Sequence, residues 1–168
     1  MKNIFLIGFM GSGKSTVAYS LCENHQMKIV EMDQVIVDRE GMSISQLFES
    51  KGEAYFRDIE TELLSEIQGK EDQVISCGGG VVLREENVKL MKSSGTIIWL
   101  NAKPETILER VKFDDKRPLL AGKKNVAFIS DMMDKRREKY QAAADITIQT
   151  DGKTIDMICQ EIIGKVGE

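Results

Sequence analysis

Residues 4–16, IFLIGFMGSGKST, decide the fold of this chain. The first four are apolar and predict a short buried strand, and the run from Gly8 to Ser15 fits the phosphate-loop pattern G-x-x-x-x-G-K-[ST] at every defined position. A glycine-rich turn that binds nothing is the alternative, but such a turn has no need of the Lys14-Ser15 pair. We therefore expect a strand, a phosphate-binding loop and a helix in succession.

Each residue type in this loop has a chemical reason. Gly8, Gly11 and Gly13 let main-chain N–H groups point inward and form an anion nest, and the following helix adds its unpaired N–H groups and the positive end of its dipole. Lys14 can reach the β- and γ-phosphate oxygens and Ser15 can ligate Mg²⁺, which supplies the charge neutralisation that phosphoryl transfer needs. The residues assigned to nucleotide binding here are Gly11, Ser12, Gly13, Lys14, Ser15 and Thr16.

The composition is that of one folded domain. With 168 residues, 42% hydrophobic and 30% charged, the chain can bury a sizeable core, so we expect a single domain over residues 1–168. The formal net charge of −4, without a cluster of lysines and arginines, argues against nucleic acid as a partner. No apolar run approaches the roughly 18 residues of a membrane span, and no cleavable signal precedes the first strand. We expect a cytoplasmic monomer that does not bind membranes.

Cysteine and histidine usage excludes several chemistries. Cys22, Cys77 and Cys159 are far apart and lack a C-x-x-C pair, and His25 is the only histidine. This pattern does not fit the usual zinc sites or a histidine-based triad, and it disfavours a nucleophilic cysteine. It predicts reduced, buried thiols in a cytoplasmic protein.

The second predicted strand, residues 27–31, ends in Glu31-Met32-Asp33, which carries two acidic residues. In an open parallel sheet the ligand crevice lies beyond the carboxyl ends of the strands, so Glu31 and Asp33 are expected where the chemistry occurs. The alternative is that they cap the next helix, with Asp33 as the N-cap of residues 34–39. Capping would not exclude a catalytic role.

A helical segment comes next. Ser43 and Gln46 form a capping box that predicts a helix start, and Gly52 predicts a break before the segment continues. Arg57 and Glu60 are three residues apart and share a helix face, so the glutamate can hold the guanidinium. As a surface ion pair this contact would mean little.

The third predicted strand, residues 73–76, runs directly into Gly78, Gly79 and Gly80. Three consecutive glycines after a core strand allow a ligand to approach the main chain closely, although a simple turn remains the alternative. Ser76 occupies the place where many phosphate-loop proteins carry an acidic residue that helps to hold Mg²⁺.

The rest of the chain alternates helices and strands. We expect helices at residues 85–93, 104–110, 126–143 and 154–166, and strands at 96–100 and 145–149. Trp99 is expected in the core. Residues 112–124 form a cationic loop that suits a mobile lid over phosphates, with a plain surface loop as the alternative. Five strands alternating with helices predict an α/β fold, a three-layer doubly wound five-stranded parallel sheet.

The chain resembles shikimate kinase over nearly its whole length. The phosphate loop alone is not specific, so the resemblance depends on further matches in the right order. These are Asp33, the block GExxFRxxE at residues 52–60, the triple glycine, Arg117-Pro118-Leu119-Leu120 in the lid, and Arg136-x-x-x-Tyr140.

This resemblance implies transfer of a phosphoryl group from ATP to shikimate, giving shikimate 3-phosphate and ADP on the way to aromatic amino acids. It implies that Asp33 contacts the ring hydroxyls and orients or deprotonates the attacking one, while Arg57 and Arg136 grip the carboxylate. Two guanidinium groups suit a planar carboxylate because they offer paired N–H donors. It assigns acceptor binding to a segment of about residues 33–61 and to Gly78, Gly79, Gly80 and Arg136.

On the nucleotide side, the resemblance implies that Arg117 reaches the phosphates from the lid and that Arg110 lies along the adenine. A lid arginine can neutralise charge that develops on the transferred phosphoryl group. Catalysis is thereby assigned to Lys14, Asp33 and Arg117.

One departure concerns the metal. The family usually has Asp-x-Asp after the second strand, its first aspartate assisting Mg²⁺ through water, whereas this chain has Glu31-Met32-Asp33. Glutamate is longer by one methylene, so both a direct and a water-mediated contact between Glu31 and Mg²⁺ remain open. Ser15 is the expected protein ligand of the metal. Alternative functions are a gluconate or nucleoside monophosphate kinase of the same architecture, or a nucleotide-binding module without transfer activity.

Overall fold

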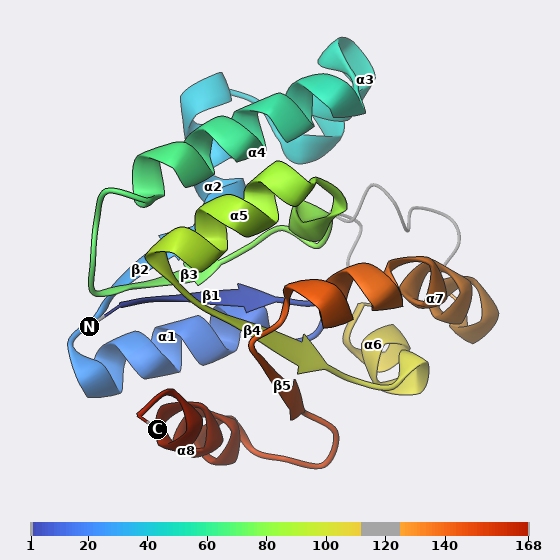
Figure 1. Ribbon diagram of the computed structural model, residues 1–168. Helices are drawn as coiled ribbons and strands as arrows, with labels where there is room; N and C mark the ends of the chain where they lie inside the picture. Colours follow the sequence, from blue (N-terminus) through green and yellow to red (C-terminus); the bar gives the residue numbers. More distant parts are fainter. Residues whose placement is uncertain (1, 112–124, 168) are drawn as a thin grey trace.

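The computed structural model describes residues 2–111 and 125–167 (Figure 1). Its five-stranded parallel sheet has the order β2-β3-β1-β4-β5. The strands are β1 Asn3–Ile7, β2 Lys28–Glu31, β3 Gln73–Ser76, β4 Gly95–Asn101 and β5 Ile146–Gln149. Each ends within one residue of its prediction, and the expected α/β sheet is confirmed. The predicted lid at 112–124, with Arg117, lies outside the described residues.

β1 lies in the centre of the sheet, which explains its apolar sequence. It pairs in parallel with β3 on one side and β4 on the other, so the main chain is hydrogen-bonded along both of its edges. Phe5 and Ile7 pack into one core cluster, and Ile4 and Leu6 into another on the opposite face, as the two-residue period of a strand requires. The phosphate loop therefore starts from a rigid, fully buried strand.

Helices cover both faces of the sheet (Figure 1). They are α1 Lys14–His25, α2 Met32–Glu40, α3 Ile44–Lys51, α4 Glu53–Ile67, α5 Glu85–Ser94, α6 Pro104–Val111, α7 Val126–Ala143 and α8 Ile155–Val166, with a 3₁₀ turn at Val81–Leu83. α1 and α8 pack on one face, and α2, α4, α5 and α7 lie on the other. α6 packs against α7 near the end of β4.

Local capping decides where the helices of the middle segment begin and end. The predicted capping box is confirmed: Ser43 Oγ accepts from the Gln46 N–H at 3.2 Å, and Gln46 Oε1 accepts from the Ser43 N–H at 2.9 Å. The predicted break at Gly52 is also confirmed, since α3 ends and α4 begins there. The capping role for Asp33 is wrong, because α2 already starts at Met32 and Asp33 lies inside its first turn.

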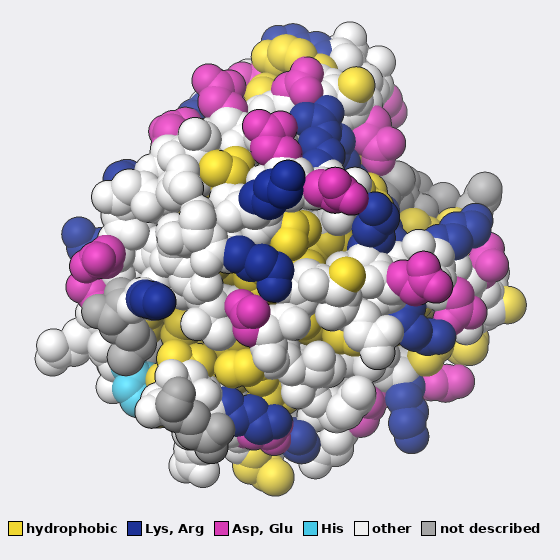
Figure 2. Space-filling view, viewed as in Figure 1, with side chains coloured by type: hydrophobic (Ala, Val, Ile, Leu, Met, Phe, Trp, Pro, Cys, Tyr) yellow, Lys and Arg dark blue, Asp and Glu magenta, His cyan; other side chains and the backbone are white. Residues whose placement is uncertain are grey.

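The surface carries mixed charge. On the face shown in Figure 2, basic and acidic side chains are interspersed over the elements, with apolar atoms between them. Within residues 2–111 and 125–167, no helix is long and apolar enough to cross a membrane.

Candidate active site

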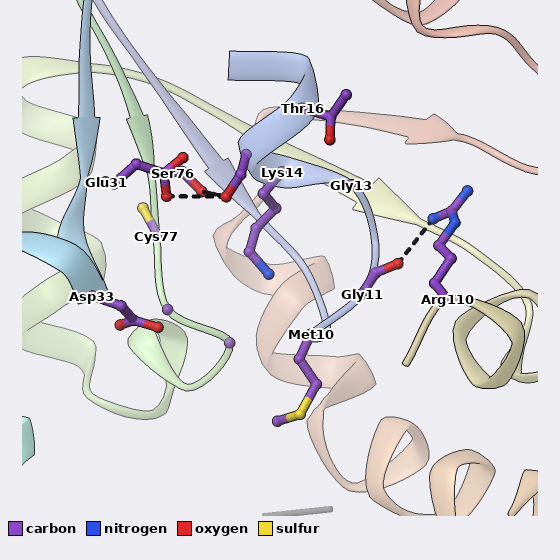
Figure 3. A pocket seen from close by; sticks show the side chains of 13 residues that line it. Met10, Gly11, Gly13, Lys14, Thr16, Glu31, Asp33, Ser76, Cys77 and Arg110 are labelled. Carbon is purple, nitrogen blue, oxygen red and sulfur yellow. Dashed lines mark hydrogen bonds between the residues drawn. The ribbon is translucent and has the colours of Figure 1, made fainter. Parts of the chain in front are cut away.

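Three neighbouring strands end at the same edge of the sheet, and each is followed by predicted site residues. The phosphate loop follows β1, Glu31 and Asp33 come at the end of β2, and the triple glycine follows β3. These segments enclose a cavity of about 300 Å³, shown in Figure 3. Its lining residues are Met10, Gly11, Gly13, Lys14, Ser15, Thr16, Glu31, Asp33, Ser76, Cys77, Gly78, Gly79 and Arg110.

The phosphate loop wraps around the Lys14 side chain. Gly13 precedes α1 with a φ of +94°, a left-handed conformation that disfavours other residues, and so lets the helix begin at Lys14. Lys14 Nζ donates to the carbonyl oxygens of Gly8 at 2.8 Å and Phe9 at 3.1 Å. The ammonium group is thus held at the mouth of the loop, beside the N–H groups of the helix start.

α6 supports the other side of the loop. A Cβ on Gly11 would lie 2.6 Å from Val111 Cγ1, so the loop packs closely on this helix. Arg110 Nη1 donates to the Gly11 carbonyl oxygen at 3.0 Å, as Figure 3 shows. The guanidinium therefore lies at the rim of the cavity.

Three side-chain oxygens gather at the start of α1. Ser15 Oγ donates to Glu31 Oε2 at 3.0 Å and lies 3.4 Å from Ser76 Oγ (Figure 3). The other carboxylate oxygen, Oε1 of Glu31, is buried and has no hydrogen-bond partner among the described residues. In the same part of the chain, no three His, Cys, Asp or Glu side chains form a metal cluster. A cation here would need phosphate or water oxygens as further ligands.

The triple glycine lies in contact with four charged side chains. A Cβ on Gly80 would lie only 2.4 Å from Arg57 Nη2, and one on Gly78 would lie 2.9 Å from Glu60 Oε2 and 3.0 Å from Asp33 Oδ1. Any side chain at these two positions would displace the charged groups. The glycines are therefore required for close approach, which a simple turn does not explain.

The Arg57 guanidinium is buried between two acidic side chains. Nη1 donates to Glu60 Oε1 at 3.2 Å and Nη2 to Glu53 Oε1 at 3.3 Å. The contact expected between Arg57 and Glu60 is present, and it is not a surface ion pair, because Arg57 is 8% exposed and Glu60 is fully buried. Burial raises the pKa of Glu60 to about 7, against the opposing effect of Arg57, and the charge of Asp33 raises it further.

α7 brings Arg136 and Tyr140 to the same glycines from the opposite side. A Cβ on Gly79 would lie 3.4 Å from Arg136 Nη1, a buried atom without a hydrogen-bond partner among the described residues. Tyr140 Oη donates to the Gly79 carbonyl oxygen at 2.5 Å. Burial raises the pKa of Tyr140, while the Arg136 guanidinium opposes this shift. Trp99 is in the core, as expected, stacked on Tyr140.

The cysteines are all free, and none is suited to nucleophilic chemistry at the cavity. Cys77 lies between β3 and the triple glycine, but burial raises the pKa of its thiol far above the ordinary value, and the nearby Glu60 charge adds to this shift. The thiol therefore stays protonated at neutral pH.

The comparison with known families gives a clear result. The model of the shikimate kinase family matches residues 10–166. The chain belongs to this family. A shikimate kinase from Persephonella marina is 46% identical over 166 residues, which is 99% of each chain.

Solved structures agree with this assignment. A structure described as shikimate kinase from Acinetobacter baumannii in complex with shikimate has a TM-score of 0.94 and 31% identity, over 99% of this chain and 93% of that one. A gluconokinase from Sinorhizobium meliloti has a TM-score of 0.60 and 15% identity, over 99% of this chain and 91% of that one, and shares the fold alone.

The predicted site residues among the described parts of the chain fall into two connected groups. The phosphate loop and Arg110 surround the cavity, and Asp33, Arg57 and Arg136 meet at the glycines. No pattern in the sequence assigned a role to Tyr140, although its position four residues after Arg136 on a helix indicates a shared face. The contact between Ser76 and Ser15 was not predicted either, because the sequence carries no local signal for it.

Proposed function

We propose that this chain transfers the γ-phosphoryl group of ATP to the 3-hydroxyl of shikimate, giving shikimate 3-phosphate and ADP. The observation that carries this proposal is the meeting of two buried arginines and one aspartate at a triple glycine, next to a phosphate loop. Family membership over residues 10–166 supports the same reaction. The enzyme is thus a phosphotransferase with an alcohol group as acceptor.

Arg57 and Arg136 are the proposed clamp for the shikimate carboxylate. Their guanidinium groups reach the glycines from α4 and α7, and each has a buried nitrogen with no partner among the described residues. Such donors are costly to leave unpaired, so an anionic ligand with two oxygens in one plane is favoured there. Asp33, against Gly78, then faces the ring hydroxyls and orients the attacking oxygen.

The phosphate loop is the proposed site of the ATP phosphates. Lys14 supplies positive charge to the transferred phosphoryl group, and the α1 N-terminus adds main-chain donors. We propose that Arg110 lies along the adenine, and its position at the cavity rim supports this role. We retain Arg117 as the lid residue that reaches the phosphates, although it lies outside the described residues.

Mg²⁺ is the proposed cofactor, and the oxygen groups near the loop fit it. Ser15 Oγ and the unpartnered Glu31 Oε1 are hard oxygen donors of the kind this cation prefers. When bound, it neutralises phosphate charge during transfer. Ser15 would hold it together with Glu31, either directly or through water, while Ser76 supports Ser15 by contact.

We also propose a single kinase domain, with acceptor binding by about residues 33–61 and a lid at about residues 112–124. The three free cysteines support a reducing, cytoplasmic compartment. A monomer is proposed because the large exposed apolar side chains of the described residues, Tyr19, Leu83 and Met157, lie on three separate elements.

The deciding experiment is a coupled assay for ADP release with Mg²⁺, ATP and a panel of acceptors: shikimate, gluconate and AMP. ADP release that depends on shikimate, with shikimate 3-phosphate as the product, is the expected result. Release with gluconate or AMP alone would assign the enzyme to the corresponding kinase class. Nucleotide binding without release for any acceptor would instead indicate a binding module.

A further inference from the structure

Tyr140 joins α7 to the triple glycine through a hydrogen bond that has no part in the roles proposed above. The tyrosine is 2% exposed, and its ring stacks on Trp99 of β4 with centroids 5.6 Å apart and an interplanar angle of 25°. Its hydroxyl donates to the Gly79 carbonyl oxygen at 2.5 Å. The ring is therefore fixed by the sheet, and its hydroxyl fixes one peptide group.

That peptide group links Gly79 to Gly80. In a planar trans peptide the carbonyl C=O and the following N–H point in opposite directions. Holding the Gly79 carbonyl toward α7 therefore turns the Gly80 N–H away from α7. No cis peptide bond is present in the described chain, so this geometry applies.

The Gly80 N–H differs from the N–H groups of the residues that follow it. Its neighbours are occupied: the Val81 N–H donates to the Gly78 carbonyl oxygen and the Leu83 N–H to the Gly80 carbonyl oxygen, both at 3.1 Å. Within residues 2–111 and 125–167, no hydrogen bond uses the Gly80 N–H itself. Glycine has no side-chain torsion and little intrinsic backbone preference, so without an external contact this peptide could rotate readily.

The acceptor site surrounds this peptide. The Gly80 Cα lies against the Arg57 guanidinium, and the Gly79 Cα faces Arg136 Nη1. A ligand held by both arginines thus lies within reach of the glycine main chain. We propose that Tyr140 is a positioning residue for the acceptor, which orients the Gly79–Gly80 peptide so that the Gly80 N–H donates to bound shikimate.

This inference rests on the proposed function, and its test compares two matched variants. Tyr140→Phe keeps the ring that stacks on Trp99 but removes the hydroxyl. Thr150→Val removes a hydroxyl of a buried residue, which donates to the Asn101 carbonyl oxygen at 3.1 Å outside the proposed site, and it serves as the control. Both variants lose one hydrogen bond from a hydroxyl to a main-chain carbonyl, so a general loss of stability is matched.

We expect Tyr140→Phe to raise the KM for shikimate about tenfold, because a misoriented donor and an unpaired carbonyl both weaken binding. Its kcat and its KM for ATP should stay within about twofold of wild type, since this contact is equal in the ground and transition states. Thr150→Val should leave all three constants within about twofold. A shikimate KM that is unchanged in Tyr140→Phe, whatever the loss of stability, would overturn the inference.

A second measurement uses the wild-type enzyme alone and does not depend on the folding of a variant. With ¹⁵N-glycine labelling, shikimate should shift the Gly80 amide resonance and slow its hydrogen exchange, whereas ADP alone should not. A Gly80 amide that does not respond to shikimate in an active enzyme would overturn the inference but leave the proposed function intact. A wild-type enzyme that does not phosphorylate shikimate would overturn the proposed function and this inference with it.

Discussion

Replacing Glu60 by glutamine should change how the stability of the protein depends on pH. Glu60 is fully buried, and its Oε1 accepts from Arg57 at 3.2 Å while Oε2 has no hydrogen-bond partner among the described residues. Glutamine keeps the size and the accepting oxygen but cannot ionise. The variant therefore isolates the effect of the buried charge.

The magnitude follows from the shifted pKa. Burial, opposed by Arg57 and reinforced by Asp33, raises the pKa of Glu60 from 4.5 to about 7. The folded state then holds this proton more tightly than the unfolded chain does. The stabilising effect of the protonated Glu60 carboxyl is therefore fully present below pH 4.5 and is lost as the pH rises through 7. Each pKa unit is worth about 1.36 kcal/mol, so the loss over this range is about 3 kcal/mol.

Urea unfolding at a series of pH values between 4 and 8 measures this effect, with the free energy obtained by linear extrapolation. The free energy of unfolding of Glu60→Gln minus that of wild type should increase by about 3 kcal/mol between the acidic and the alkaline end of this range. Glu53→Gln is the matched control, since Glu53 contacts the same arginine but its side chain is 54% exposed. Parallel curves for wild type and Glu60→Gln would refute the argument that a buried, ionisable carboxyl lies beneath Arg57.

Three further predictions concern the reaction itself. Arg136→Ala should raise the KM for shikimate about 10- to 150-fold without changing ADP affinity, because charge-assisted hydrogen bonds of about 1.5–3 kcal/mol are lost. Arg137→Ala, at the exposed neighbouring residue, should change neither the shikimate KM nor the ADP affinity. An equal loss of affinity for shikimate and ADP in Arg136→Ala would contradict the carboxylate clamp. Lys14→Met should lower kcat about 10²–10³-fold in steady-state assays, and a near wild-type rate would exclude Lys14 from phosphoryl transfer. Asp33→Asn should lower the single-turnover rate about 10²–10⁴-fold while equilibrium binding of shikimate persists; lost binding with an intact rate at saturation would make Asp33 a binding residue only.

Local patterns in the sequence determined the fold and the phosphate site. The apolar run of residues 4–7 marks a strand buried on both faces, and the glycine–lysine–serine pattern after it requires a loop followed by a helix start. The capping box at Ser43 and the break at Gly52 were equally readable. Each of these features is decided by interactions within a few residues, so it is visible before the chain folds.

The acceptor side depended on the tertiary structure. From the sequence, Arg57 and Glu60 looked like an ordinary helix pair, and only the packing of α4 against the sheet shows that both are buried. Tyr140 and Gly79 are 61 residues apart in the chain, and no local pattern indicates that the hydroxyl of one meets the carbonyl of the other. Burial and long-range hydrogen bonds arise when strand ends and helices come together at one edge of the sheet. Sequence patterns specify the residue types available at that edge, whereas packing decides which of them touch and which charges lose their water.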